Sequence, residues 1–207
     1  MENDSSKFRL GRLETLTDGL FAIVMTILVL DIKIPHDINL YKNVNLEQFL
    51  TGYIQDVLVY MVVFIVLAFI WFIHHAHTHI LAQTDRNHIW INIVLLMFVA
   101  LVPFSSSLIN KFPTDWLAGM LLGANMLIIG LLGYASWSYA TTDNRLVSAE
   151  LKPSYVKAEK GKLLLFSMVS MLVMVTALVY PHLSFYVFLL APLFLFANRL
   201  FNKTKQS

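Results

Sequence analysis

Long stretches without Asp, Glu, Lys or Arg limit the folds that this chain can adopt. The stretches are 19–30, 57–83, 87–110, 116–142 and 163–198. Charged residues make up only 14% of the sequence, whereas soluble domains carry about 25%. A soluble core of this size cannot bury so much apolar surface, so the stretches predict helices that cross a membrane.

The last stretch, 163–198, is long enough for two helices and contains a point at which they can separate. Tyr180, Pro181 and His182 lie near its middle, and a proline ends one helix and favours the first turn of the next. The fold class is therefore predicted to be an all-α integral membrane protein with six transmembrane helices per subunit, in a single domain over 1–207. The expected helices span approximately 13–34, 53–80, 87–110, 115–140, 161–180 and 183–201.

The basic residues predict the orientation of these helices. With the N-terminus inside, twelve Lys and Arg residues lie in inner segments and three in outer ones. The positive-inside rule then places both termini in the cytoplasm, and we expect the chain in the plasma or inner membrane of the cell. The basic stretch 145–162 is expected to lie against anionic lipid headgroups, most simply as a topogenic charge cluster.

The remaining composition excludes some classes of function. A formal net charge of +2 is too small to indicate nucleic acid as a partner, and the chain contains no cysteine for disulfides or thiolate metal sites. The first twelve residues are polar and of mixed charge, unlike a cleavable signal peptide. No cofactor is predicted.

The first predicted helix differs from the others because its charge-free run is short. Asp18 and Asp31 enclose only 12 residues, and charges inside a span tend to face the interior of a bundle or water. At 100° per residue, Ile23, Ile27 and Leu30 fall within about 60° of one another, together with Ile34, and Thr26 lies at the edge of this stripe. The stripe either packs against neighbouring helices or, with several copies converging, forms a hydrophobic constriction that gates ions by dewetting.

Two sequence motifs resemble those of the transmembrane protein 175 family, the endolysosomal potassium channels and their bacterial relatives. The family pattern in the first helix is Arg, three variable residues and Phe-Ser-Asp, in which Arg12 and Asp18 match here and Leu16 and Thr17 differ. The resemblance extends through the second and third predicted helices as far as Ser106. Their matching residues are Trp71, His74, His75, Asp85, Trp90, Asn92, Pro103 and Phe104.

The resemblance implies a potassium-permeable cation channel and not an enzyme. Bacterial members with one six-helix unit look like homotetramers, so four copies of the first helix would surround a pore for potassium and other monovalent cations. The chain has no Thr-Val-Gly-Tyr-Gly filter, and selection would therefore rest on side chains. Ile23 is the strongest constriction candidate, Ile27 and Leu30 would form further layers, and Thr26 would offer a ring of hydroxyl groups.

A structural brace for the pore helix also follows from the resemblance. Asp18 is expected to pair with His74 or His75, and further with Trp71 and Asn92. Arg12 either joins this brace or meets lipid phosphate. His77 and His79 have no counterpart in the family and are expected to be solvated.

Two other functions compete with a channel. His75 and His79 are four residues apart on a helix, a spacing that suits a metal, but no Glu follows in the HExxH manner; neither a metal site nor a catalytic residue is predicted. A secondary transporter of a small cation or solute is the alternative. Carriers need carboxylates and broken helices at mid-membrane depth, whereas Asp18 and Asp31 lie near the ends of their helix.

Overall fold

The protein is described by a computed structural model that covers residues 10–33 and 45–193. Five of its helical segments are long and apolar enough to cross a membrane: Leu10–Asp31, Ile54–Thr78, Arg86–Lys111, Trp116–Asn144 and Pro153–Val179. These segments confirm an all-helical membrane protein. The expected sixth helix, 183–201, begins within the shorter apolar segment Pro181–Leu193, and its remainder lies outside the described residues.

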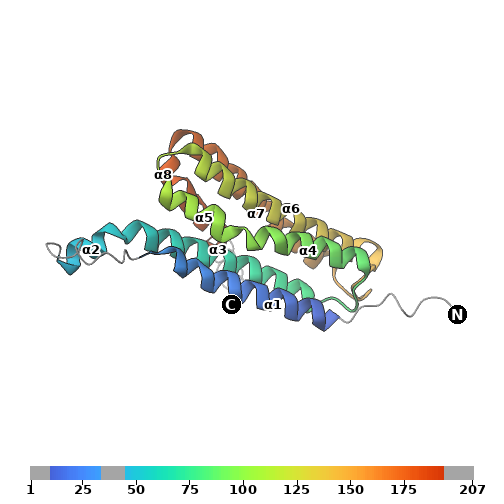
Figure 1. Cartoon of the computed structure of the whole chain (residues 1–207). Helices are drawn as coiled ribbons and strands as arrows, with labels where there is room; N and C mark the ends of the chain where they lie inside the picture. The colour runs from blue at the N-terminus through green and yellow to red at the C-terminus, as the bar shows by residue number, and fades with distance from the viewer. Residues whose placement is uncertain (1–9, 34–44, 194–207) are drawn as a thin grey trace, which may run out of the picture.

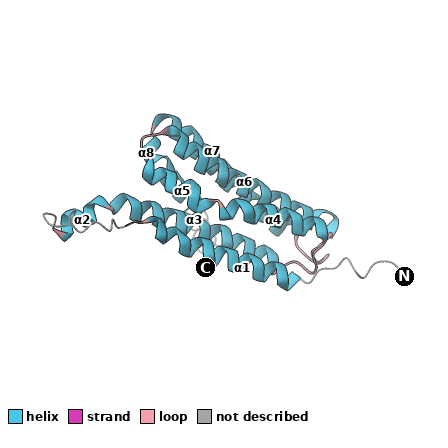
Figure 2. Cartoon of the chain, in the orientation of Figure 1, coloured by secondary structure: helices cyan, strands magenta, loops and turns pink. Residues whose placement is uncertain are grey.

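The helices follow one another along the chain without a sheet in the described ranges, apart from one isolated bridge between Leu81 and Val147 (Figure 2). In order they are α1 (Leu10–Ile27), the 3₁₀ turn η2 (Leu28–Asp31), α2 (Leu46–Gly52), α3 (Ile54–Thr78), α4 (Arg86–Ala100), α5 (Val102–Lys111), α6 (Trp116–Thr141), η4 (Thr142–Asn144), α7 (Pro153–Val179), α8 (Pro181–Ser184) and η5 (Phe185–Leu189).

Short polar residues start three of these helices by capping free backbone N–H groups. Asn45 accepts a hydrogen bond from the backbone of Gln48 at 2.9 Å and begins α2. Asp85 accepts from the backbone of His88 at 2.8 Å and begins α4, and Asp115 caps α6 in the same way. Such caps satisfy donors that have no partner within the helix.

Proline sets two interruptions, and the sequence predicted the one at Pro181. Pro103 lies in the first turn of α5, where the third span breaks at Leu101, and Pro181 begins α8 directly after α7 ends at Val179. The start of α7 differs from the expectation, because the helix begins at Pro153 and not near 161. A proline in the first turn, followed by good helix formers, extends the helix through the basic stretch.

The helices form an elongated bundle in which α1 lies beside α3, while α4, α6 and α7 form the opposite layer (Figure 1). Apolar side chains from both layers meet in one core, which includes Phe21 and Val24 of α1. At one end the loops after α3 and α6 join, because the backbone N–H of Ala82 donates to the carbonyl of Leu146 at 2.9 Å. This loop pairing ties α3, α4 and α6 together at that end.

Glycines on α6 allow α7 to approach closely. A Cβ atom added at Gly119 would lie 2.7 Å from the Cβ of Ala177 and 2.7 Å from Oγ of Ser184. One added at Gly130 would lie 2.6 Å from Oγ of Ser167. Small residues commonly permit such backbone approach between membrane helices. We call this contact the glycine seam.

Replacing Gly119 with Ala is expected to destabilise the bundle, because the new methyl group collides with α7. The cost should be about 1–3 kcal/mol, as for other overpacked cores. The matched control is Gly161→Ala on α7, where nothing lies within 4 Å of the added Cβ; it should be neutral or stabilising by up to about 1 kcal/mol. Thermal unfolding in detergent measures both, and equal shifts would contradict the close seam.

Candidate ion pathway

The helix α1 has two different faces. Leu13, Thr17, Phe21 and Val24 are buried against the rest of the subunit. The other face, continued by η2, presents apolar side chains that the described part of the subunit leaves exposed: Leu16, Ile23, Ile27 and Leu30. Ile23 is 59% exposed and Leu30 is 70% exposed. The predicted stripe is thus turned away from its own subunit, except that Ile34 lies outside the described residues.

Thr26 lies on the same uncovered side of α1, with its hydroxyl bonded to the helix backbone. Its Oγ1 donates to the carbonyl oxygen of Ala22, at 2.9 Å, or of Ile23, at 2.8 Å. A hydroxyl has one hydrogen to donate and two lone pairs that accept. Since the hydrogen is used within the helix, the lone pairs of Oγ1 stay available to a cation or to water.

One direct polar contact joins the inward side of α1 to α3. The indole Nε1 of Trp71 donates a hydrogen bond to Oδ1 of Asp18 at 2.9 Å. Both groups are partly buried, so breaking the bond would leave a carboxylate oxygen and an N–H group short of partners. Asp18 and Trp71, two of the expected brace residues, are therefore in contact.

The other expected brace residues form a separate network between α3, α4 and α6. His74 Nε2 lies 2.9 Å from Oδ1 of Asn92. The amide nitrogen of Asn92 donates to Ser136 at 3.1 Å and to the carbonyl of His88 at 2.8 Å. His88 Nε2 lies 3.1 Å from the hydroxyl of Ser136, and its Nδ1 lies 2.9 Å from the hydroxyl of Thr84. These bonds satisfy polar groups that are buried among apolar helices.

The expected pairing of Asp18 with a histidine is not seen. Among the described residues, neither His74 nor His75 hydrogen-bonds to Asp18. His75 instead stacks on the indole of Trp71, with ring centroids 5.1 Å apart. Its Nδ1 is buried and has no hydrogen-bond partner in the described part of the chain. Arg12 is exposed at the start of α1.

The expectation that His77 is solvated is wrong, since only 9% of the residue is exposed. Its Nε2 lies 3.2 Å from Oε2 of Glu159 on α7, and its ring stacks on Trp137 at 4.2 Å. Lys162 also pairs with Glu159. A buried carboxylate needs such partners. Sequence reasoning missed Glu159, although its position three residues before Lys162 in a basic stretch was a usable signal.

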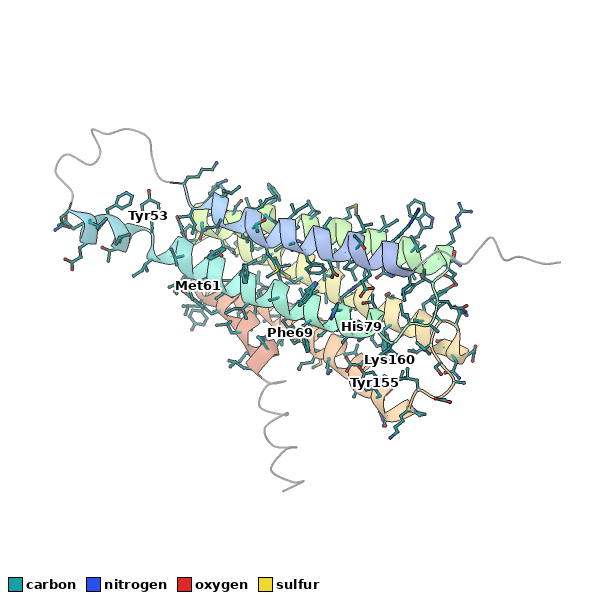
Figure 3. The ribbon with its side chains drawn as sticks, turned by 90° about the horizontal axis from the view of Figure 1, so that it is seen from below. Tyr53, Met61, Phe69, His79, Tyr155 and Lys160 are labelled. Carbon is teal, nitrogen blue, oxygen red and sulfur yellow. The ribbon has the colours of Figure 1, made fainter. Side chains whose placement is uncertain are left out.

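His79 is exposed as expected and lies at the same end of the bundle as Tyr155 and Lys160 of α7 (Figure 3).

The sequence also did not predict a contact between α6 and the start of α4. Tyr139 donates from its hydroxyl to Oδ2 of Asp85 at 2.8 Å, and the guanidinium of Arg145 stands 4.3 Å above the centroid of the Tyr139 ring. Asp85 thus both caps α4 and ties it to α6.

A small cavity lies between α3, α4, α6 and α7. Its volume is about 40 Å³, and its polar lining comes from His74, His77, Thr78, His88, Asn92 and Ser136. No residue of α1 and no carboxylate is part of the lining. The cavity is large enough for a water molecule, and it is separate from the uncovered face of α1.

Known proteins share this arrangement and its motifs. Residues 12–103 match the family model described as "Endosomal/lysosomal potassium channel TMEM175". A potassium channel of Chamaesiphon minutus is 31% identical over 141 residues, which is 67% of this chain and 69% of that relative. This chain belongs to the TMEM175 family. A potassium channel of Streptomyces collinus is 28% identical over 162 residues, covering 76% of this chain and 77% of the relative.

The fold is also that of the TMEM175 family. The crystal structure of a lysosomal potassium-selective channel TMEM175 homologue from Chamaesiphon minutus matches with a TM-score of 0.78 and 27% identity. The match covers 91% of this chain and 97% of that one. As a TMEM175 member, the protein is a multi-pass membrane protein of an ion channel family and not an enzyme.

Replacing Trp71 with Phe is expected to loosen the attachment of α1, because it removes the N–H donor to Asp18 and keeps most of the aromatic ring. Leaving the partly buried carboxylate short of a partner should cost about 1–3 kcal/mol. Thermal unfolding and amide hydrogen exchange of α1 measure the effect. Trp90→Phe is the control, since Trp90 is 55% exposed and its change should leave both readouts unaltered. If the amide hydrogens of α1 exchange at the same rate in both variants, the contact between Trp71 and Asp18 does not hold α1 in place.

Proposed function

We propose that this chain is a potassium-permeable channel in which several copies, most simply four, surround a pore lined by the uncovered face of α1. Membership of a potassium channel family supports potassium as the permeant ion. The bacterial relatives support the cell membrane as its location. The excess of basic residues in the segments assigned to the inside supports cytoplasmic termini.

The observation that carries the proposal is the two-sided character of α1. Its inward face is built into the core, and Asp18 secures it to α3. Its outward face, continued by η2, carries branched aliphatic side chains at Ile23, Ile27 and Leu30 that the described residues of the subunit leave exposed. Exposed aliphatic groups could equally face lipid, but copies of α1 that converge would bring these side chains into rings around an axis.

Such rings would act as a constriction and not as a binding cage. Aliphatic rings exclude water from a narrow pore and so control ion passage by dewetting. Thr26 lies between the aliphatic levels of Ile23 and Ile27, and its free lone pairs would supply oxygen atoms to a partly dehydrated cation. Oxygen ligands from side chains, without a carbonyl filter, would give modest selection of potassium over sodium.

A secondary transporter is supported less well by the described residues. A carrier of cations needs acidic side chains within the membrane at its substrate site. No carboxylate lines the cavity between α3, α4, α6 and α7. Glu159, the buried carboxylate of α7, is already paired with His77 and Lys162.

Replacing Ile23 with Asn is expected to hydrate the constriction and raise sodium permeation relative to potassium. Leu30→Ala should act in the same direction more weakly, because it widens the pore without adding a polar group. Planar-bilayer recording of the purified protein in a potassium/sodium gradient measures the reversal potential. Val175→Asn on α7 is the matched control, since Val175 is 60% exposed and lies away from α1. A reversal potential unchanged by both α1 substitutions would exclude the proposed lining.

The same recordings separate a channel from a carrier. Unitary currents that reverse towards the potassium potential and persist without a proton gradient are expected. Flux that stops when the proton gradient is dissipated, without unitary events, would favour the transporter. The subunit number is tested by native mass spectrometry of the wild-type protein in detergent, where a tetramer is expected and a stable monomer would contradict a pore between copies.

A further inference from the structure

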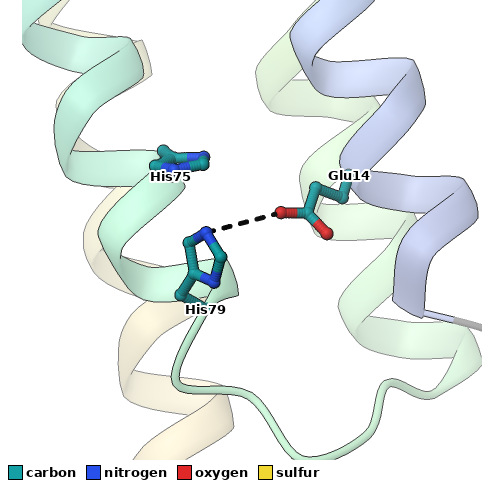
Figure 4. Close-up of side chains that lie close together, drawn as sticks. All are labelled: Glu14, His75 and His79. Atoms are coloured by element: carbon teal, nitrogen blue, oxygen red, sulfur yellow. Dashed lines mark ion pairs between the residues drawn. The ribbon is translucent and has the colours of Figure 1, made fainter.

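Three potential metal ligands gather where the first turns of α1 meet the last turns of α3. They are Glu14, His75 and His79, and one ligand atom from each lies within 4.8 Å of the other two. Figure 4 shows the carboxylate of Glu14 facing the two imidazole rings across the space between the helices. The two histidines are four residues apart and therefore project from the same side of α3.

We infer that Glu14, His75 and His79 bind a divalent transition-metal ion of the zinc class. Two imidazole nitrogens and one carboxylate oxygen are a ligand set that zinc uses when it keeps a fourth position for water. Hard cations such as magnesium prefer sites made of oxygen atoms alone. The sequence offered only the two histidines, because Glu14 is 61 residues before His75 in the chain and reaches them only through the packing of α1 on α3.

The separation of the side chains is near what an ion requires. His79 Nε2 and Oε1 of Glu14 are 4.0 Å apart, too far for a hydrogen bond. With bonds of 2.0–2.1 Å to tetrahedral zinc, two ligand atoms lie about 3.3 Å apart. Small rotations of the Glu14 and His79 side chains close this difference, because both are accessible: 33% and 64% of these side chains are exposed.

The surroundings of His75 favour a ligand role. Its buried Nδ1 lacks a hydrogen-bond partner in the described part of the chain, whereas buried polar atoms are nearly always satisfied. The ring is held on one side by stacking on Trp71 and meets the His79 ring edge-on at 4.5 Å. This packing limits the rotation of His75 and leaves the more mobile His79 and Glu14 to complete the coordination.

Zinc titration of the tag-free, full-length protein in detergent tests the site by calorimetry and by thermal unfolding. We expect a single Zn²⁺ to bind per chain and to raise the unfolding temperature, and we expect Mg²⁺ to do neither. Glu14→Gln and His79→Ala, which change the two accessible ligands, should each weaken zinc binding at least about tenfold, a loss at least as large as that for removing a residue that only hydrogen-bonds to a zinc ligand.

The control is His182→Ala, which removes an exposed histidine at α8, outside the site. It should leave the zinc affinity unchanged. Zinc affinity that is insensitive to both Glu14→Gln and His79→Ala, or the absence of any zinc effect on the wild-type protein, would overturn the assignment. The site does not depend on ion conduction, so this titration and the bilayer recordings succeed or fail separately.

Discussion

Inside a bilayer no water is available to satisfy polar groups, and the arrangement of this bundle follows from that constraint. Many of its buried polar side chains bond to one another. His74, Asn92, His88 and Ser136 bond to one another across three helices, and Glu159 has both an imidazole and an ammonium group as partners. Each bond fixes the rotation and the depth of the helix that carries it, so the apolar packing elsewhere has a defined register.

The attachment of α1 depends on the same constraint but uses fewer bonds. An indole–carboxylate hydrogen bond and the Glu14–His79 ion pair join it to α3 and its C-cap, and the other buried side chains of its inward face are apolar except for Thr17. An element held by few polar contacts is easier to shift than one locked by a network. The proposed zinc ligands lie on the same two helices, so a bound ion would strengthen the polar connection between them.

Sequence patterns predicted the parts of the fold that depend on local chemistry. Charge-free runs marked the spans, and Pro181 marked the point at which the last run divides. The spacing of Ile23, Ile27 and Leu30 placed them on one side of α1, where they remain uncovered. The pairing of His77 with Glu159 could not be predicted in this way, nor could the choice of Trp71 over His74 and His75 as the hydrogen-bond partner of Asp18. Those contacts depend on the depth and the rotation of each helix relative to its neighbour. The sequence of a single segment does not determine either quantity.

The glycine seam has a mechanical consequence for the bundle. Where one added methyl group at Gly119 would collide with Ala177 and Ser184, the two backbones have no space in which to slide or tilt separately. Close-packed interiors transmit displacement with little compression. We therefore expect the α6–α7 pair to move as one stiff body when the subunit rearranges.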